Sequence, residues 1–429
     1  MDEENFEKKS SKKTLKIVLL ILLILAIAGA VTFFALNKVN SKPDKVFEKA
    51  VDQMFEETEK VQEYKTASME LDISGEVKAT ETNTSSGIST VATQINMINT
   101  ILKDAKLHTE VQVDLENKLL DLVLAAQYQN KDVISVEGLI QDGKVYAYLK
   151  DLYSKYIEIP SSELEGIDVS AIFETSKGNA NLTKDIKEIL KSKIEDSEFE
   201  TEKAEIEIDG KTKKVNKSTM KLSMKELGDI CYDILDKVKE QQDSEVKEMI
   251  TEMQEELKNP GETENYMNID IYSEKTGNKI VKVDVSLVNE DDDEVILISG
   301  TKTEDKTWEI VFSINEDSTD TKDVKDMMKM VITEENENEG KISFTVIVEE
   351  EGIEATVNIK YKVEYNKDIE KKNVRNSINA NSMTEADFME IYQNAQKNEI
   401  LKSIIDYVSA TSGIVNQVPN PSYNNLYNY

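Results

Sequence analysis

Twenty consecutive uncharged and mostly apolar residues, from Ile17 to Leu36, constrain this chain more than any other feature of its sequence. A helix rises roughly 1.5 Å per residue, so a helix of this length matches a hydrocarbon core of about 30 Å. Everything after Asn37 is too polar to follow this segment into lipid. The run therefore predicts one transmembrane helix over 17–36, with a cytoplasmic tail over 1–16 before it.

The distribution of lysines predicts the orientation of that helix. Five lysines precede the run and three follow it at a comparable distance: Lys8, Lys9, Lys12, Lys13 and Lys16 against Lys38, Lys42 and Lys45. Positive charge stays on the cytoplasmic side, so we expect a single-pass protein of the cell membrane, with a cytoplasmic N-terminus and an extracytoplasmic C-terminal part. A cleaved signal peptide is the alternative, because 26–28 and 28–30 have the small-x-small form of a cleavage site. The apolar run continues past both sites, which favours a retained anchor.

Composition limits the partners and the chemistry of the large polar part. The chain has 84 acidic and 52 basic residues, a net charge of −32, and this acidity argues against nucleic acid as a partner. Its one cysteine, Cys231, excludes an intramolecular disulfide. Cys231 falls on a stripe with helical spacing together with Leu227, Ile230 and Ile234, so we interpret it as a small buried hydrophobe.

Alternating apolar residues predict a large antiparallel sheet. Residues 69–77, 107–115, 120–128, 133–140 and 145–149 have a period of two, and Asp142-Gly143 is a strong hairpin turn. A second hairpin is expected at Asp209-Gly210, with strands 204–208 and 215–222. From residue 267 the chain is nearly all strand, over 267–271, 280–288, 294–300, 307–314, 341–348 and 353–365.

Helical periodicity predicts the elements that cover this sheet. Apolar residues recur at a spacing of three and four in several stretches. These are the segment after Pro43, the segment from Ile88 to Leu102, and residues 186–194, 224–239, 246–257, 388–395 and 400–408. The fold class is therefore α+β: a transmembrane helix, then a large curved antiparallel sheet packed with amphipathic helices. We expect one extracytoplasmic domain over 37–414, with a candidate subdivision near residue 198, and a disordered tail over 415–429.

No motif of an enzyme is present. The single histidine, His108, alternates with the apolar residues of its strand and is expected to face solvent, and no Gly-x-Ser-x-Gly elbow or phosphate loop occurs. Five residues at EF-hand-like offsets, Asn315, Asp317, Thr319, Asp323 and Asp326, lack the glycine of a calcium loop, since Asp320 stands there. We interpret them as a solvated acidic hairpin, and the sequence indicates no metal site, no cofactor and no catalytic residue.

The run from Gly143 to Pro160 (GKVYAYLKDLYSKYIEIP), with the Asp209-Gly210 hairpin and its return through Met220-Lys221-Leu222, resembles the large half-barrel proteins of the lipoprotein-carrier type. The layout is also similar to that of anchored ectodomains of Gram-positive bacteria. This resemblance is a shared pattern of hydropathy and turns, and it extends over about residues 44–365. It implies a curved sheet that wraps helices and leaves an apolar cavity for an acyl chain.

These patterns together predict a non-enzymatic, membrane-anchored binding protein that holds a lipid or another amphiphile. The residues predicted to line the ligand are Ile88, Val91, Ile95, Ile98, Leu120, Leu122, Leu124, Ala126, Tyr146 and Tyr148. Tyrosines that alternate along a strand are more often ordinary sheet residues than a ligand platform. The first alternative is a cell-envelope interaction module with a packed core, whose partner is an envelope protein. The second alternative is an envelope hydrolase that uses carboxylates.

Overall fold

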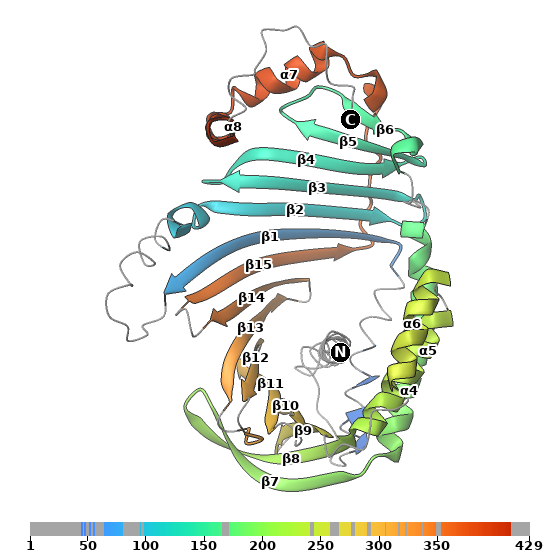
Figure 1. Ribbon diagram of the computed structural model, residues 1–429, viewed down its shortest axis with the longest axis vertical. Helices are drawn as coiled ribbons and strands as arrows, with labels where there is room; N and C mark the ends of the chain where they lie inside the picture. Colours follow the sequence, from blue (N-terminus) through green and yellow to red (C-terminus); the bar gives the residue numbers. More distant parts are fainter. Residues whose placement is uncertain are drawn as a thin grey trace, which may run out of the picture. The chain divides into compact units, whose positions relative to one another are not determined.

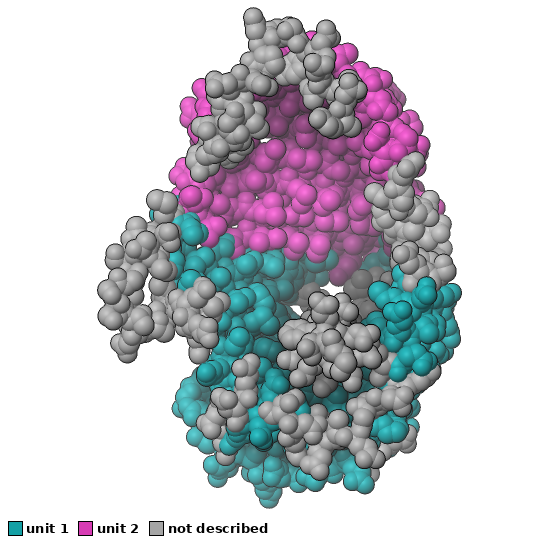
Figure 2. Space-filling view, in the orientation of Figure 1, with its two compact units in different colours: residues 1–65, 75–100, 171–363 teal, residues 66–74, 101–170, 364–429 magenta. Residues whose placement is uncertain are grey.

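The structure is a computed structural model, and it describes most of the chain after residue 43. The described residues are 44–45, 47–48, 51–52, 55, 64–79, 95, 98–164, 171–240, 244–257, 266–275, 279–289, 293–304, 306–315, 318–321, 324–336, 338–348 and 353–412. They form two compact units (Figure 2). Unit 1 comprises 1–65, 75–100 and 171–363, and unit 2 comprises 66–74, 101–170 and 364–429. The domain boundaries expected from the sequence stay predictions.

Unit 1 is built on an antiparallel sheet in which the strands from β7 to β15 are neighbours in chain order and β1 lies beside β15. Figure 1 shows that its strands turn progressively, so this sheet is curved. The order is the end of β1 (Thr66–Ala79), then β15 (Ile353–Tyr365), β14 (Glu339–Val348), β13 (Lys325–Asn336), β12 (Thr307–Asn315), β11 (Glu294–Glu304), β10 (Ile280–Asn289), β9 (Tyr266–Glu274), β8 (Lys211–Ser223) and β7 (Phe199–Ile208).

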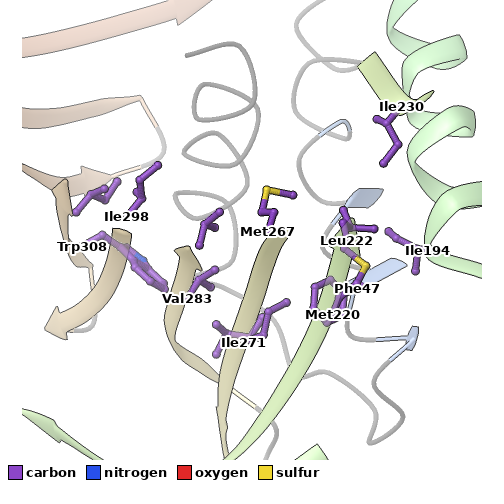
Figure 3. Close-up of a cluster of buried hydrophobic side chains, with 13 residues drawn as sticks. Phe47, Ile194, Met220, Leu222, Ile230, Met267, Ile271, Val283, Ile298 and Trp308 are labelled. Carbon is purple, nitrogen blue, oxygen red and sulfur yellow. The ribbon is translucent and has the colours of Figure 1, made fainter. Parts of the chain in front are cut away.

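The core of unit 1 lies between that sheet and its helices. These are α4 (Ala171–Asp196), α5 (Met224–Glu240) and α6 (Ser244–Leu257). Apolar side chains from β8 to β12 meet Ile194 of α4, Ile230 of α5 and Phe47 in one buried cluster (Figure 3). Trp308 is among the most deeply buried of them. Helix α5 begins as the capping box predicts, since Ser223 and Glu226 exchange hydrogen bonds.

Unit 2 is built on a second run of antiparallel strands that ends in one parallel pair. The order is the start of β1, then β2 (Ala105–Asp114), β3 (Leu119–Tyr128), β4 (Lys131–Gln141), β5 (Lys144–Lys150), β6 (Tyr156–Ile159) and β16 (Ser377–Asn379). The Asp142-Gly143 turn joins β4 to β5 with φ of 54° and 74°, which is the backbone of a two-residue hairpin turn.

Two helices and an irregular segment complete unit 2. Helix α7 (Glu385–Ala395) begins at a capping box in which Asp387 accepts hydrogen bonds from the amide and hydroxyl of Thr384, and α8 (Glu399–Ser412) follows it. The segment 366–376, which we call the strap, leads from β15 to β16 without regular structure. It lies against β3 and β4 through Lys372.

The predicted α+β class and its antiparallel sheet are confirmed, and three strands were not predicted. Strand β13 falls partly in the region interpreted as an acidic hairpin, and β6 and β16 are short. Helix α4 starts at Ala171, well before the predicted 186. None of the described helices combines the length and hydropathy of a membrane span. The predicted transmembrane helix over 17–36 and the predicted tail over 415–429 lie outside the described residues.

Candidate binding face

One face of the unit 2 sheet carries apolar side chains on every strand from β1 to β6. Strand register defines this set, because directly paired residues point to the same side. We call it the apolar face: Ala67, Met69, Leu71, Ile73, Leu107, Thr109, Val111, Val113, Leu120, Leu122, Leu124, Ala126, Ile134, Val136, Gly138, Ile140, Val145, Ala147, Leu149, Ile157 and Ile159. No charged residue is among them.

One part of the apolar face is exposed to solvent. Three of its aliphatic side chains, Leu107, Leu124 and Ile134, are exposed by 42%, 41% and 36%. They lie close together, since Leu107 and Ile134 both pair with Ala126, two residues from Leu124. Soluble proteins seldom expose neighbouring large aliphatic side chains without a partner or ligand.

The structure brings together one part of the predicted ligand-lining set. Leu120, Leu122, Leu124 and Ala126 all lie on the apolar face, on adjacent positions of β3. Of the predicted helical stripe, Ile95 is buried and Ile98 is exposed, both in unit 1. Ile88 and Val91 lie outside the described residues.

The two predicted tyrosines lie on the other side of the same sheet. Tyr146 pairs with Leu139 and Tyr148 with Glu137, whereas the leucines of β3 pair with Ile140, Gly138 and Val136. Successive residues of a strand point to opposite faces. Tyr146 and Tyr148 therefore cannot line a ligand together with Leu120, Leu122 and Leu124.

That opposite side holds a cluster of tyrosines and charged groups. The ring of Tyr156 stacks on Tyr148 at a centroid distance of 4.8 Å and forms a T-shaped contact with Tyr146 at a centroid distance of 6.3 Å. The Tyr156 hydroxyl donates to Glu137 Oε1 at 3.0 Å. Burial and the Glu137 carboxylate raise the pKa of the Tyr156 phenol well above its usual range. These tyrosines pack against one another on the side of the sheet opposite the apolar face.

Lys372 of the strap lies between two carboxylates in this cluster and offsets part of their charge. Its Nζ lies 3.0 Å from Asp121 Oδ2 and 3.6 Å from Glu137 Oε1, and the carboxylate side chains are only 4% and 11% exposed. Gln141 holds the Lys372 backbone, accepting from its amide at 2.8 Å and donating to its carbonyl at 3.1 Å. Burial alone would lower the pKa of Lys372, but Asp121 and Glu137 raise it on balance. The sequence carries no periodic signal for this contact.

A second polar contact fixes α7 to unit 2. Asp387 accepts from the Tyr153 hydroxyl at 2.6 Å and from Lys155 Nζ at 2.9 Å. Its hydrogen bonds with Thr384, Tyr153 and Lys155 hold the pKa of the Asp387 carboxyl well below its usual range. With this side of α7 turned inward, Phe388, Met389 and Tyr392 are left exposed.

The reactive or metal-binding candidates noted in the sequence have the following surroundings in the described part of the chain. Burial raises the pKa of the Cys231 thiol to about 11, so it is almost entirely protonated at neutral pH. Among the described residues no group of three His, Cys, Asp or Glu side chains could hold a metal ion. Of the EF-hand-like set, Asp326 accepts a hydrogen bond from Ser313, while Asp317 and Asp323 lie outside the described residues.

His108 joins two strands instead of simply facing solvent. On the side of the sheet opposite the apolar face, its Nδ1 lies 2.7 Å from Asp72 Oδ1 on β1 and its Nε2 lies 3.0 Å from Glu110 Oε1. Only the imidazolium can donate to both carboxylates at once. The hydrogen bond to Glu110, opposed by burial and helped by Asp72, raises the pKa of His108.

This arrangement predicts a pH-dependent stability. The pKa of His108 is higher in the folded state than its unfolded value of about 6.5. Its contribution to the free energy of unfolding is therefore fully present below about pH 6.5 and is lost as the pH rises through the folded-state pKa. We expect the urea concentration at the unfolding midpoint to decrease as the pH is raised from about 6 to about 8.5. In His108→Gln this dependence on pH should be absent. Urea titrations at both pH values test this, and the imidazole resonances of the single histidine give its pKa. A wild-type slope retained in His108→Gln would contradict the assignment.

Comparisons with known proteins identify no family. No family model matches the chain, and no curated protein matches it significantly. Among solved structures, intact Ap-TbpB with its N and C lobes is similar at 8% identity and a TM-score of 0.13, over 70% of this chain and 76% of that chain. A mutant of transferrin binding protein B from Haemophilus parasuis Hp5 is similar at 6% identity and a TM-score of 0.11, over 71% and 76%. TM-scores this low support no conclusion about fold or function.

Proposed function

We propose that this protein is a membrane-anchored extracytoplasmic binding protein that accepts the hydrocarbon part of an amphiphile on the apolar face of unit 2. The observation that carries the proposal is the group of exposed aliphatic side chains, Leu107, Leu124 and Ile134, on three neighbouring strands. A hydrocarbon chain that covers them removes apolar area from water, with a gain of about 25 cal/mol per Å².

The sequence supports the location of this function. Residues 17–36 form an apolar run long enough for one membrane helix, and the lysines before it favour a cytoplasmic N-terminus. The part after residue 37 then works beside a lipid surface, which is a source of amphiphiles. The resemblance of the sequence to half-barrel lipoprotein carriers agrees with this assignment and remains part of the proposal.

A single substitution on the apolar face tests the function. The full-length protein is reconstituted in nanodiscs and exposed to a long-chain fatty acid that carries a photoreactive diazirine. Leu124→Asp places a charge on an already exposed position, so the fold tolerates it while the contact with hydrocarbon is lost. We expect at least a tenfold loss of photolabelling, measured by mass spectrometry of the intact protein.

Met249→Asp is the matched control, because Met249 is exposed by 56% on α6 of unit 1 and lies outside the apolar face. Its labelling should equal that of the wild type. Equal labelling of Leu124→Asp and wild type, or no specific labelling of either, would remove the basis for this function.

The exposed side of α7 favours a second candidate, an interaction module of the cell envelope. Phe388, Met389 and Tyr392 lie within two turns of one helix and remain in contact with water. Aromatic residues and methionine are enriched in protein interfaces. If the apolar face is not labelled, this second candidate is tested by co-purification from the cell envelope. An envelope protein that co-purifies with the wild type but not with Phe388→Asp would support it.

A further inference from the structure

Strand β7 forms an open edge of the sheet in unit 1 (Figure 1). It is the last strand in the sheet order, and among the described residues only β8 pairs with it, since β11 approaches it without pairing. The ten residues of β7 contain no proline, and the register with β8 runs from Phe199 to Ile208 without a bulge. The side chains at 200–203 and at Glu205 are exposed. This part of β7 is therefore accessible to a further strand.

The hairpin turn determines which backbone groups of β7 face outward. Asp209 and Gly210 form a two-residue turn with φ of 52° and 70°, so the residues that flank the turn, Ile208 and Lys211, are a hydrogen-bonded pair. Hydrogen-bonded and non-hydrogen-bonded pairs alternate along an antiparallel ladder. The exposed residues whose amide and carbonyl point away from β8 are therefore Thr201, Lys203 and Glu205. Such outward groups are the template to which an additional strand hydrogen-bonds.

The side chains beside this edge are acidic, and β8 shows how a neighbouring strand pairs with them. Lys214 Nζ lies 3.5 Å from Glu205 Oε1, and these two residues are directly opposite in the register. Lys217 lies opposite Glu202 in the same way, also at 3.5 Å. Glu200 is a third exposed glutamate of this edge. Opposite charges directly across two strands stabilise their pairing, so a strand on the outer side pairs best with lysines opposite these three glutamates.

The charge of β7 argues against a second copy of this chain as the occupant. The strand contains four glutamates and one lysine, and the whole chain has a net charge of −32. Edge strands are commonly protected from unwanted pairing by bulges, prolines or charged side chains. Because β7 has neither a bulge nor a proline, its protection is its negative charge. This charge repels other acidic strands and attracts a basic one.

We infer that the outer edge of β7 takes up an extended, lysine-bearing segment of a partner protein as an additional antiparallel strand. Antiparallel pairing is the more stable per residue. The segment places lysines opposite Glu205, Glu202 and Glu200, which gives the spacing K-x-x-K-x-K, and an acidic residue opposite Lys203. Backbone hydrogen bonds supply the affinity and the lysine spacing supplies the specificity. The edge belongs to unit 1, so the inference does not depend on the proposed function of unit 2.

A pair of synthetic peptides tests the lysine spacing on the full-length protein in nanodiscs. The probe is a capped, fluorescent peptide of sequence TKVEKTKV, and its control is TVEKKKTV, which has the same composition and charge. At about 0.15 M salt, fluorescence anisotropy should show at least about fivefold weaker binding of the control. Equal binding of the two peptides would overturn the inference, because a purely electrostatic attraction to this acidic chain does not distinguish them.

Methylation of the peptide backbone tests the added strand directly. Methyl groups on the probe amides that lie opposite Thr201 and Lys203 block hydrogen bonds to β7, and binding should weaken at least about tenfold. Methyl groups on the probe amides opposite Glu202 and Ala204 point away from β7 and should leave binding unchanged. Equal effects of the two methylation patterns would contradict pairing along this edge.

Thr201→Pro removes one outward amide without changing the charge of β7. Thr201 lies opposite Ser218 in a non-hydrogen-bonded pair, so no hydrogen bond to β8 is lost, and proline is tolerated at such edge positions. The thermal midpoint should stay close to that of the wild type while the probe binds at least about tenfold more weakly. Thr201→Val keeps the amide and is the matched control, with binding equal to that of the wild type.

The oligomeric state distinguishes a partner protein from a second copy. Sedimentation of the full-length protein in detergent, without peptide, should show a single chain for the wild type and for Thr201→Pro. A wild-type dimer that Thr201→Pro dissociates would overturn the basic partner, since the edge would then be occupied by another copy of this chain. Failure of the probe to bind the wild type would overturn it as well.

Discussion

Lys372→Met is expected to lower the free energy of unfolding of unit 2 by about 2–4 kcal/mol. The substitution leaves Asp121 and Glu137 buried without their cation, and the Oδ1 atom of Asp121 is already without a hydrogen-bond partner in the described part of the chain. Breaking a fully buried ion pair costs about 3–5 kcal/mol, and the partial exposure of Lys372 reduces that figure. Urea denaturation, with hydrogen exchange of β3 and β4 as the local measurement, tests this.

The neighbouring lysine provides the control for Lys372. Lys371 pairs with Asp142, and both side chains are at least half exposed, so Lys371→Met should change stability by less than about 1 kcal/mol. Adding Asp121→Asn and Glu137→Gln to Lys372→Met should recover part of the loss, because the buried charges are then removed. Equal effects of the Lys371 and Lys372 substitutions would show that the strap is not held by this contact.

Trp308→Ala is expected to lower the free energy of unfolding of unit 1 by about 3–5 kcal/mol. Trp308 is 2% exposed within the buried cluster that joins β8–β12 to the helices (Figure 3), so its removal leaves a cavity there. Thermal and urea denaturation followed by circular dichroism measure the change.

Trp308→Phe separates the volume of this side chain from its polarity. The indole Nε1 of Trp308 is buried with no hydrogen-bond partner in the described residues, so phenylalanine removes no hydrogen bond and restores most of the apolar volume. We expect less than half of the loss seen for Trp308→Ala. Equal losses for the two variants would contradict the role of Trp308 as a space-filling residue of the core.

Alternation and turn chemistry were sufficient to predict most of the strands. Strands β1–β5 and the hairpins at Asp142-Gly143 and Asp209-Gly210 follow from a period of two and from residues that accept positive φ. Strand β13 was missed because Met327, Met328 and Met330 alternate irregularly and an acidic stretch precedes them. Short strands such as β16 depend on a partner that is distant in sequence, so no local pattern marks them.

The residues predicted to line a ligand lie on two different sides of one sheet. The leucines of β3 share one face, as their alternation indicates, but Tyr146 and Tyr148 were assigned to the wrong side of the sheet for a shared site. Counting register through the two-residue turn at Asp142-Gly143 would have separated them, because that turn pairs Gln141 with Lys144. The role of Lys372 was not predictable, since its partners lie more than 200 positions away in an irregular contact.

The position of photolabelling on the chain tests the central claim most directly. The full-length protein in nanodiscs is irradiated with the diazirine fatty acid, digested and sequenced by mass spectrometry to locate each labelled residue. We predict labels on the apolar face, above all on Leu122, Leu124 and Ala147 of β3 and β5. Labels confined to the opposite face of this sheet, or to α7, would contradict the claim that the apolar face of unit 2 binds an amphiphile.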